Sequence, residues 1–229
     1  MILRGRPIHP GVSQAPTRLI TPHDLADLHH ARYHVESDQG LQEIFRRPDF
    51  RMRSLSELRG APLDNPDEHA LLEVTFWSAV NEVLESRGSG IIFSVASVIS
   101  RYLRSAVFSL HPESQEEYRC LAELGKSVLA SLLRFRKSKY ATSPGYIVLA
   151  TSLNLQEAVS LPPRIVGYAI GTGVDQKLRI AAELLEVPAV TGLEALEEKA
   201  SALRFARLDG VAGTLEEVSE SDSGSTTLS

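Results

Sequence analysis

Apolar residues recur every three or four positions through the middle of the chain, which is the period of an amphipathic helix. The pattern predicts three helices, at about residues 67–86, 90–110 and 112–136. The first has Leu71, Leu72, Phe76, Val80, Val83 and Leu84 on one face, and the second has Ile92, Val95, Ile99, Leu103 and Val107. Consecutive amphipathic helices of this kind favour a helical bundle or a pair of helical hairpins.

The period changes after Pro144-Gly145, where short apolar runs begin to alternate with short helical patterns. Alternation of strands and helices is typical of an α/β unit. We predict strands at 146–150, 165–170 and 189–190 and helices at 154–159, 177–185 and 193–199. Residues 206–210 then lead through a turn into a closing strand or hairpin at 213–218.

The beginning of the chain also reads as extended structure. A short strand, a turn at Pro10-Gly11 and a second extended piece ending near Ile20 are expected, followed by a helix that begins at Leu25. Residues 36–66 are polar and interrupted by prolines, so we expect a loop with broken helical turns. The small polar residues of 219–229 predict a disordered tail.

Composition excludes several functional classes. A net charge of -5 argues against a general nucleic-acid-binding protein, which would normally be basic. A single cysteine, Cys120, cannot form an internal disulfide, and no Cys/His cluster has zinc spacing. The first residues lack the apolar core of a signal peptide, and the apolar runs are shorter than the roughly 20 residues that span a bilayer. We therefore expect a cytoplasmic protein with no metal, no cofactor and no membrane contact.

One segment, GYAIGTGVDQKLRIAAELLEVPAVTG at 167–192, carries the clearest motif. It resembles the mobile phosphohistidine domain of the phosphoenolpyruvate-utilising enzymes. In that family a Gly-Gly-x-Thr-Ser-His turn opens a helix, and an Ala-x-x-x-x-(Ile/Val)-Pro-Ala-(Val/Ile)-x-Gly stretch follows. Gly173 matches the first part, and the second part is matched by Ala182, Val187, Pro188, Ala189, Val190 and Gly192.

The same alignment places Lys177 where the family has its phosphate-carrying histidine, with Asp175 and Gln176 in place of Thr and Ser. Phosphoryl transfer through a side chain needs a nucleophile that is partly neutral near pH 7, which imidazole supplies and a hydrated lysine cation does not. Asp175 also adds negative charge to a helix N-terminus that would otherwise favour phosphate. Without the resemblance, the segment is simply a strand-to-helix turn, because an isolated Gly-x-Gly is a weak phosphate signal.

The order of elements resembles the amino-terminal half of Enzyme I of the bacterial phosphotransferase system. The start matches its Gly-x-x-x-x-Pro-Gly-(Val/Ile) motif at Gly5, Pro10, Gly11 and Val12, and Leu124 to Leu133 resemble its last bundle helix. This resemblance implies an α/β swivelling, phosphohistidine-like domain made of 1–22 and 140–218. A long α-helical bundle subdomain, 23–139, would be inserted into it, and 219–229 would be a tail.

The resemblance also implies a partner. In the family the helical domain docks a small phosphocarrier protein, and the segment EHALLE, with Glu68, His69 and Glu73, resembles part of that domain. A solvated histidine in a first helical turn is the alternative for His69. A phosphocarrier-like or other cytoplasmic protein is therefore the expected partner.

Three functions stay open at this stage. The first is a catalytically degenerate Enzyme I-like protein, which binds a partner or regulates a phosphotransferase system but is not itself an enzyme. It rests on Lys177 and on the expected absence of the phosphoenolpyruvate-binding barrel, into which the family continues after the region that this chain resembles. The second is an active phosphotransfer component whose acceptor has moved to another histidine, with His9 the candidate. The third is a scaffolding protein unrelated to phosphotransfer.

Overall fold

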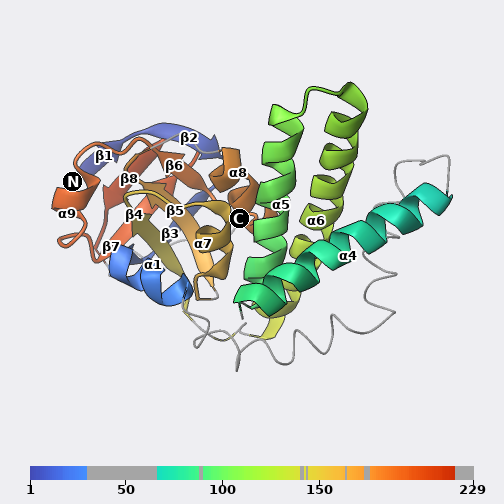
Figure 1. Cartoon of the computed structure of the whole chain (residues 1–229). Helices are drawn as coiled ribbons and strands as arrows, with labels where there is room; N and C mark the ends of the chain where they lie inside the picture. Colours follow the sequence, from blue (N-terminus) through green and yellow to red (C-terminus); the bar gives the residue numbers. More distant parts are fainter. Residues whose placement is uncertain are drawn as a thin grey trace, which may run out of the picture. The chain divides into compact units, whose positions relative to one another are not determined.

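The computed structural model describes residues 1–29, 66–87, 90–139, 142, 144–162, 164–172 and 176–219 (Figure 1). The chain divides into two compact units. The α/β unit consists of Met1–Leu25, Arg136–Asn154 and Leu161–Ser229, and the helical unit of Ala26–Phe135 and Leu155–Ser160. The described helices are α1 (Pro22–His29), α4 (Pro66–Arg87), α5 (Ile91–Phe108), α6 (Pro112–Lys139), α7 (Leu155–Ser160), α8 (Gln176–Leu185) and α9 (Leu196–Lys199).

An eight-stranded mixed sheet forms the α/β unit, in the order β1-β8-β7-β3-β4-β5-β6-β2. The strands are β1 (Ile2–Arg4), β2 (Arg6–His9), β3 (Val12–Ile20), β4 (Tyr146–Ala150), β5 (Ile165–Ile170), β6 (Ala189–Thr191), β7 (Phe205–Asp209) and β8 (Thr214–Glu217). Strands β3, β4, β5 and β6 run parallel to one another, and the others join antiparallel. The fold is thus mixed α/β.

The long strand β3 holds the two parts of the sheet together. Its first half, from Val12 to Pro16, pairs antiparallel with β7. Its second half, from Thr17 to Ile20, pairs parallel with β4. Consequently, one strand from the beginning of the chain joins two segments that lie more than a hundred residues later in the sequence.

The sheet closes on itself at Gly5. Strands β1 and β2 stand at opposite ends of the strand order, yet only Gly5 separates them in the sequence (Figure 1). One extended residue spans only about 3.5 Å, so the two edges must meet there. The Gly5 N–H donates to the Gly213 carbonyl at 2.8 Å, and a Cβ at Gly5 would lie 2.4 Å from the Thr191 carbonyl oxygen. Only glycine fits this position without a shift of the backbone.

Small and aliphatic side chains fill the inside of the closed sheet. Buried residues come from nearly every strand and from the segment around α9: Leu3, Ala15, Ile147, Leu149, Ala169, Val190, Leu193, Leu196, Ala200, Leu203, Ala206, Leu208 and Leu215. Burial of apolar surface on this scale, at about 25 cal/mol per Å², is the main favourable term that holds the strands together. The apolar runs that predicted the strands therefore form this core.

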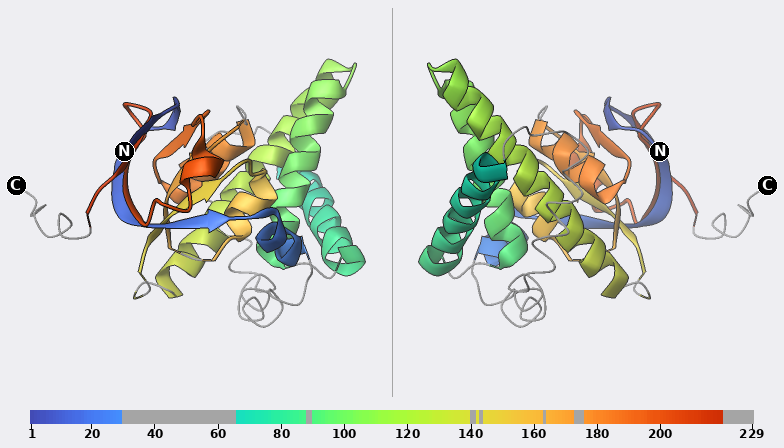
Figure 2. Two further views of the ribbon diagram at one scale, coloured as in Figure 1. Left: turned by 90° about the vertical axis from the view of Figure 1, so that its left-hand side faces the viewer. Right: turned by 90° about the vertical axis from the view of Figure 1, so that its right-hand side faces the viewer.

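The helical unit is built around α5 (Figure 2). Helix α6 approaches it closely at Gly125, where a Cβ would lie 2.5 Å from Ile99 Cγ1 and 2.9 Å from Phe76 Cε2. On α4, the Phe76 and Trp77 rings meet edge to face, with centroids 5.0 Å apart. The glycine inside α6 thus lets three helices pack tightly, which compensates for its low helix propensity.

Helix α5 is the most apolar of the long described helices. By length and composition it is the one described helix that could cross a membrane, with a mean hydropathy of 1.4 over 18 residues. Serines and arginines interrupt its apolar residues, so the sequence has no continuous apolar run here. In the folded chain 61% of it is buried, as in the core helix of a helical bundle.

Most predicted elements are confirmed, with differences at the ends of helices. Helix α1 begins at Pro22 rather than Leu25, because Thr21 and Asp24 cap it: the Thr21 N–H donates to Asp24 Oδ2 at 2.8 Å. The helix predicted at 193–199 begins only at Leu196, since Ala195 has φ 59° and Leu193 is buried in the core. The predicted loop at 36–66 lies outside the described residues, as does nearly all of the predicted tail at 219–229.

We predict that Gly5→Ala destabilises the α/β unit by about 2–3 kcal/mol, because the added methyl group must displace the Thr191 backbone. Hydrogen exchange of strand peptides, measured by mass spectrometry, should show loss of protection in β1, β2, β6 and β8. Gly171→Ala is the matched control, because a Cβ there meets its nearest atoms at an ordinary 3.6 Å. Equal protection in Gly5→Ala and the wild type would contradict closure at this residue.

Candidate functional site

The motif residue Lys177 is the second residue of α8. Helix α8 follows β5 and buries Leu178, Ile180, Ala181 and Ala182, so its helical period fixes which residues face the core. Gln176 is exposed and Lys177 is partly buried. Gly173 and Asp175, the other residues of the degenerate carrier motif, lie outside the described residues. Lys177 therefore lies in the first turn of the helix that follows the carboxyl end of the parallel strand β5.

A small polar cluster lies at the carboxyl ends of β4 and β5. The Thr172 N–H and hydroxyl both donate to the Thr151 carbonyl, at 2.8 and 3.0 Å. The Thr151 hydroxyl donates in turn to Glu197 Oε1 of α9. The carboxyl ends of parallel strands are the usual ligand edge of an α/β sheet. Sequence reasoning missed this cluster, because its members are distant along the chain and belong to no motif.

The proposed alternative acceptor, His9, lies at the other end of α8. Its Nδ1 is 2.9 Å from the Val187 carbonyl oxygen, so Nδ1 donates this hydrogen bond, and in the neutral imidazole the lone pair is on Nε2. Val187 comes two residues after α8 ends, whereas Lys177 is near its beginning. Eight residues of helix separate Lys177 from Leu185, which is about 12 Å at 1.5 Å per residue. His9 and Lys177 are thus not parts of one site.

The predicted partner residues lie near the beginning of α4. Glu68, His69 and Glu73 are all within this helix, which starts at Pro66 and runs to Arg87. Their side chains are outside what the structure describes. Their role in binding therefore stays a prediction.

One core prediction in the helical unit is wrong. Helical spacing put Val107 on the buried face of α5, but it is 74% exposed, as α5 ends at Phe108 and α6 begins at Pro112. Near the end of a hairpin there is no neighbouring helix left to cover such a position. Only the position of the turn, which Pro112 indicates, could have revealed this from the sequence.

A basic and aromatic cluster lies at the opposite edge of the parallel strands, around Tyr146. The Arg18 guanidinium lies over the Tyr146 ring, 5.7 Å from its centroid, and the phenol donates to the Pro162 carbonyl at 2.8 Å. Burial raises the pKa of Tyr146 to about 12, although Arg18 and Arg136 partly offset it. Burial also raises the pKa of Tyr168, which is fully buried.

No group of three or more His, Cys, Asp or Glu side chains in the described residues could hold a metal ion. Cys120 is half-buried, and burial raises the pKa of its thiol, so it lacks the lowered pKa of a reactive cysteine. The described residues thus show neither clustered metal ligands nor a thiol with a lowered pKa. The polar groups near the carboxyl ends of β4 and β5 are the hydroxyls of Thr151 and Thr172 and the carboxylate of Glu197. The ammonium group of Lys177 belongs to the helix that follows β5.

No protein-family model and no curated protein sequence matches this chain. Among solved structures, it is similar to the "N-terminal domain of Enzyme 1 - Nitrogen", with 22% identity over 93% of this chain and 92% of that one, and a TM-score of 0.47. A second neighbour is a solution structure of the Enzyme I protein nEIt, with 17% identity, 96% and 94% coverage, and a TM-score of 0.38. With identities and TM-scores this low, function must be argued from the residues themselves.

We predict that stability falls as the pH rises from about 10 to 12. Tyr146 and Tyr168 have raised pKa values in the folded chain, so they ionise first in the unfolded chain, at about pH 10, and this favours unfolding. Urea midpoints measured between pH 8 and 12 should show this loss, and Tyr146→Phe should reduce it. A tyrosinate absorbance titration identical in native and urea-unfolded protein would contradict the prediction.

Proposed function

We propose that this chain is a catalytically degenerate, Enzyme I-like module that binds a phosphocarrier-like or other cytoplasmic protein and does not itself carry phosphate. The observation that carries the proposal is Lys177 in the first turn of α8. The sequence motif assigns this position to the carrier histidine, and the motif residues Ala182, Val187 and Pro188 follow in the expected order.

The chemistry of lysine supports the loss of transfer. A lysine ammonium group donates hydrogen bonds but has no lone pair with which to attack phosphorus. The last histidine of the chain is His111, so the whole return segment from β4 to β8 contains no other imidazole that could replace the carrier. A cation at this place can still attract a phosphorylated partner, because ammonium groups bind phosphate as point charges.

Retention of the helical unit supports the binding part of the proposal. Helix α4 extends over 22 residues, and its buried Phe76, Trp77 and Val80 pack it into the helical unit. The segment that resembles the carrier-docking region, from Glu68 to Glu73, occupies the first turns of this helix. An element that is regularly built and stably packed is a suitable surface for a rigid partner.

A displaced acceptor is the second candidate function, and one contact favours it. Because His9 Nδ1 donates to the Val187 carbonyl, Nε2 is the ring nitrogen whose lone pair could attack phosphorus in the neutral imidazole. Because His9 lies at the opposite end of α8 from Lys177, transfer through His9 would need a docking geometry different from the one that the resemblance implies.

We expect the wild-type chain to bind an unphosphorylated phosphocarrier protein, measured by calorimetry, and to take no label when the carrier is phosphorylated. The first result follows from the α4 surface and the second from Lys177. Direct incubation with phosphoenolpyruvate, Mg²⁺ and a competent barrel domain should give no label on the chain either. Acid-labile phosphohistidine on this chain would contradict the degenerate assignment, and its loss in His9→Ala would establish the displaced acceptor.

A separate pair of variants tests carrier binding. His69→Ala should weaken carrier binding by about tenfold, which corresponds to about 1.4 kcal/mol. His23→Ala, an exposed histidine of α1, should leave it unchanged. Absence of carrier binding by the folded wild type would reject this partner while leaving the labelling result intact.

We further predict that Lys177→His alone gives at most weak phosphorylation from a phosphorylated carrier, and that adding Asp175→Thr and Gln176→Ser strengthens it. Two unit charges about 4 Å apart interact by on the order of 1–4 kcal/mol at effective dielectric constants between water and protein surface. Removing the Asp175 charge therefore changes the rate by roughly five- to a thousandfold. A triple variant that folds and binds the carrier but takes no phosphate would refute the assignment of position 177.

A further inference from the structure

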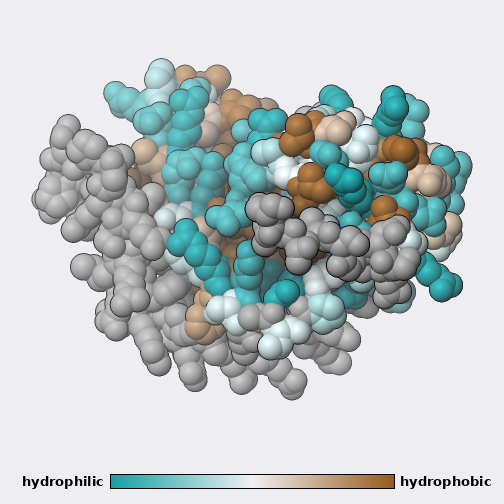
Figure 3. Space-filling model, turned by 180° about the vertical axis from the view of Figure 1, so that it is seen from behind, coloured by the Kyte–Doolittle hydropathy of each residue, from teal (hydrophilic) through white to brown (hydrophobic). Residues whose placement is uncertain are grey.

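Large apolar side chains are exposed together where α5 turns into α6. Val107 is 74%, Phe108 76% and Leu110 92% exposed, whereas most of α5 is buried. We call these three residues the hairpin tip. Figure 3 shows apolar surface at this end of the helical hairpin next to hydrophilic surface. Contiguous exposed apolar residues of this size usually mark an interaction site.

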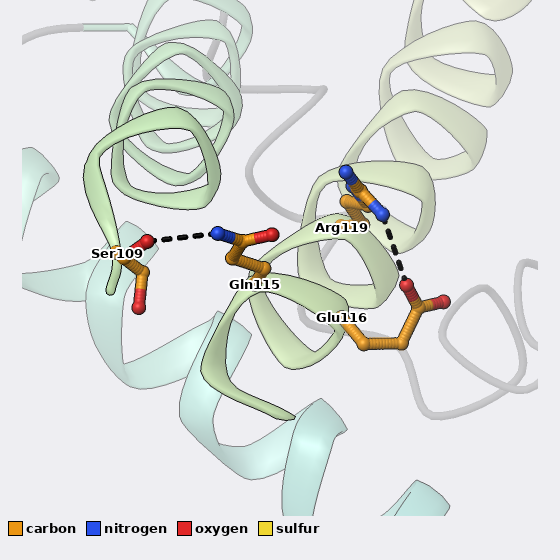
Figure 4. A network of polar contacts seen from close by, with 4 residues as sticks. All are labelled: Ser109, Gln115, Glu116 and Arg119. Atoms are coloured by element: carbon orange, nitrogen blue, oxygen red, sulfur yellow. Dashed lines mark hydrogen bonds and ion pairs between the residues drawn. The ribbon is translucent and has the colours of Figure 1, made fainter. Parts of the chain in front are cut away.

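Hydrogen bonds hold the turn in one conformation. The Ser109 N–H donates to the Ser105 carbonyl at 2.9 Å and closes α5. Gln115 Nε2, in the first turns of α6, donates to the Ser109 carbonyl at 2.8 Å (Figure 4). The Gln115 N–H also donates to the His111 carbonyl at 3.0 Å. A turn fixed in this way loses little conformational entropy when it binds, so its apolar side chains are efficient anchors.

Charges of opposite sign flank the hairpin tip. Arg104 precedes Val107 and Phe108 by three and four residues, so the three share one face of α5. All of them are exposed. On the other side of Leu110, the first exposed charged residues of α6 are acidic: Glu113, Glu116 and Glu117. The surface is therefore basic on the α5 side, apolar in the centre and acidic on the α6 side.

We propose that the hairpin tip is a two-fold contact with a second copy of this chain. A two-fold axis through the apolar centre sets the basic side of one copy against the acidic side of the other, so the surface is complementary to itself. A partner with a surface of a single charge sign would be repelled by one side or the other. Three side chains per copy bury well under the 1,200 Å² or so of a stable interface, so the dimer is weak and reversible.

The test is sedimentation equilibrium of the full chain from about 10 μM to about 1 mM, the range in which a weak contact of this size populates a dimer. Phe108→Ser should weaken dimerisation at least about tenfold, as expected for a central aromatic anchor. Val211→Ser is the matched control, because Val211 is also apolar and 68% exposed but lies in the β7–β8 turn. Circular dichroism confirms that each variant is folded.

Charge reversal identifies the partner surface. Arg104→Glu and Glu113→Arg should each weaken the dimer several-fold, and the double variant should restore it, because the opposite charges again face each other across the two-fold axis. A wild type that stays monomeric throughout the range would overturn the proposal. So would a dimer unaffected by Phe108→Ser, or a double variant weaker than both single variants.

Discussion

Closure of the sheet at Gly5 is the constraint on which the α/β unit depends. Because β1 pairs with β8 and β2 with β6, the first nine residues join both ends of the strand order. The two end strands of the order are thus consecutive in the sequence, and their outer sides are the sheet edges that lie next to Gly5. The closure depends on a residue without a side chain, since the Gly5 Cα faces the Thr191 carbonyl and its N–H donates to Gly213.

Closure also fixes the place of the candidate site. Strand β2 pairs antiparallel with β6. The hydrogen bond from His9 to the Val187 carbonyl connects the end of β2 to the loop that joins α8 and β6. With β6 held between β2 and β5, helix α8 has to start at the far end of β5, and Lys177 comes with it. The polar cluster of Thr151, Thr172 and Glu197 lies at the carboxyl ends of these strands because β4 and β5 run parallel.

Local pattern predicted most elements but not their pairing. The strands 146–150 and 165–170 were located by their apolar runs, and both helices beside Gly125 by their period. The partners of β3 could not be read from the sequence, because pairing between residues so far apart leaves no local signal. The same holds for the separation of His9 from Lys177, which depends on the register of β2 against β6. The exposure of Val107 was missed because periodicity describes one helix and burial depends on its neighbours.

The buried residues that hold helix α8 do not include residue 177. Helix α8 is held by Leu178, Ala181 and Ala182, which face the core, whereas residue 177 is only partly buried at the first turn. The chemistry of this position can therefore change while the buried apolar contacts of α8 stay the same. The helical unit has its own core around Phe76, Ile99 and Gly125. A change of the side chain at position 177 therefore leaves this second core untouched.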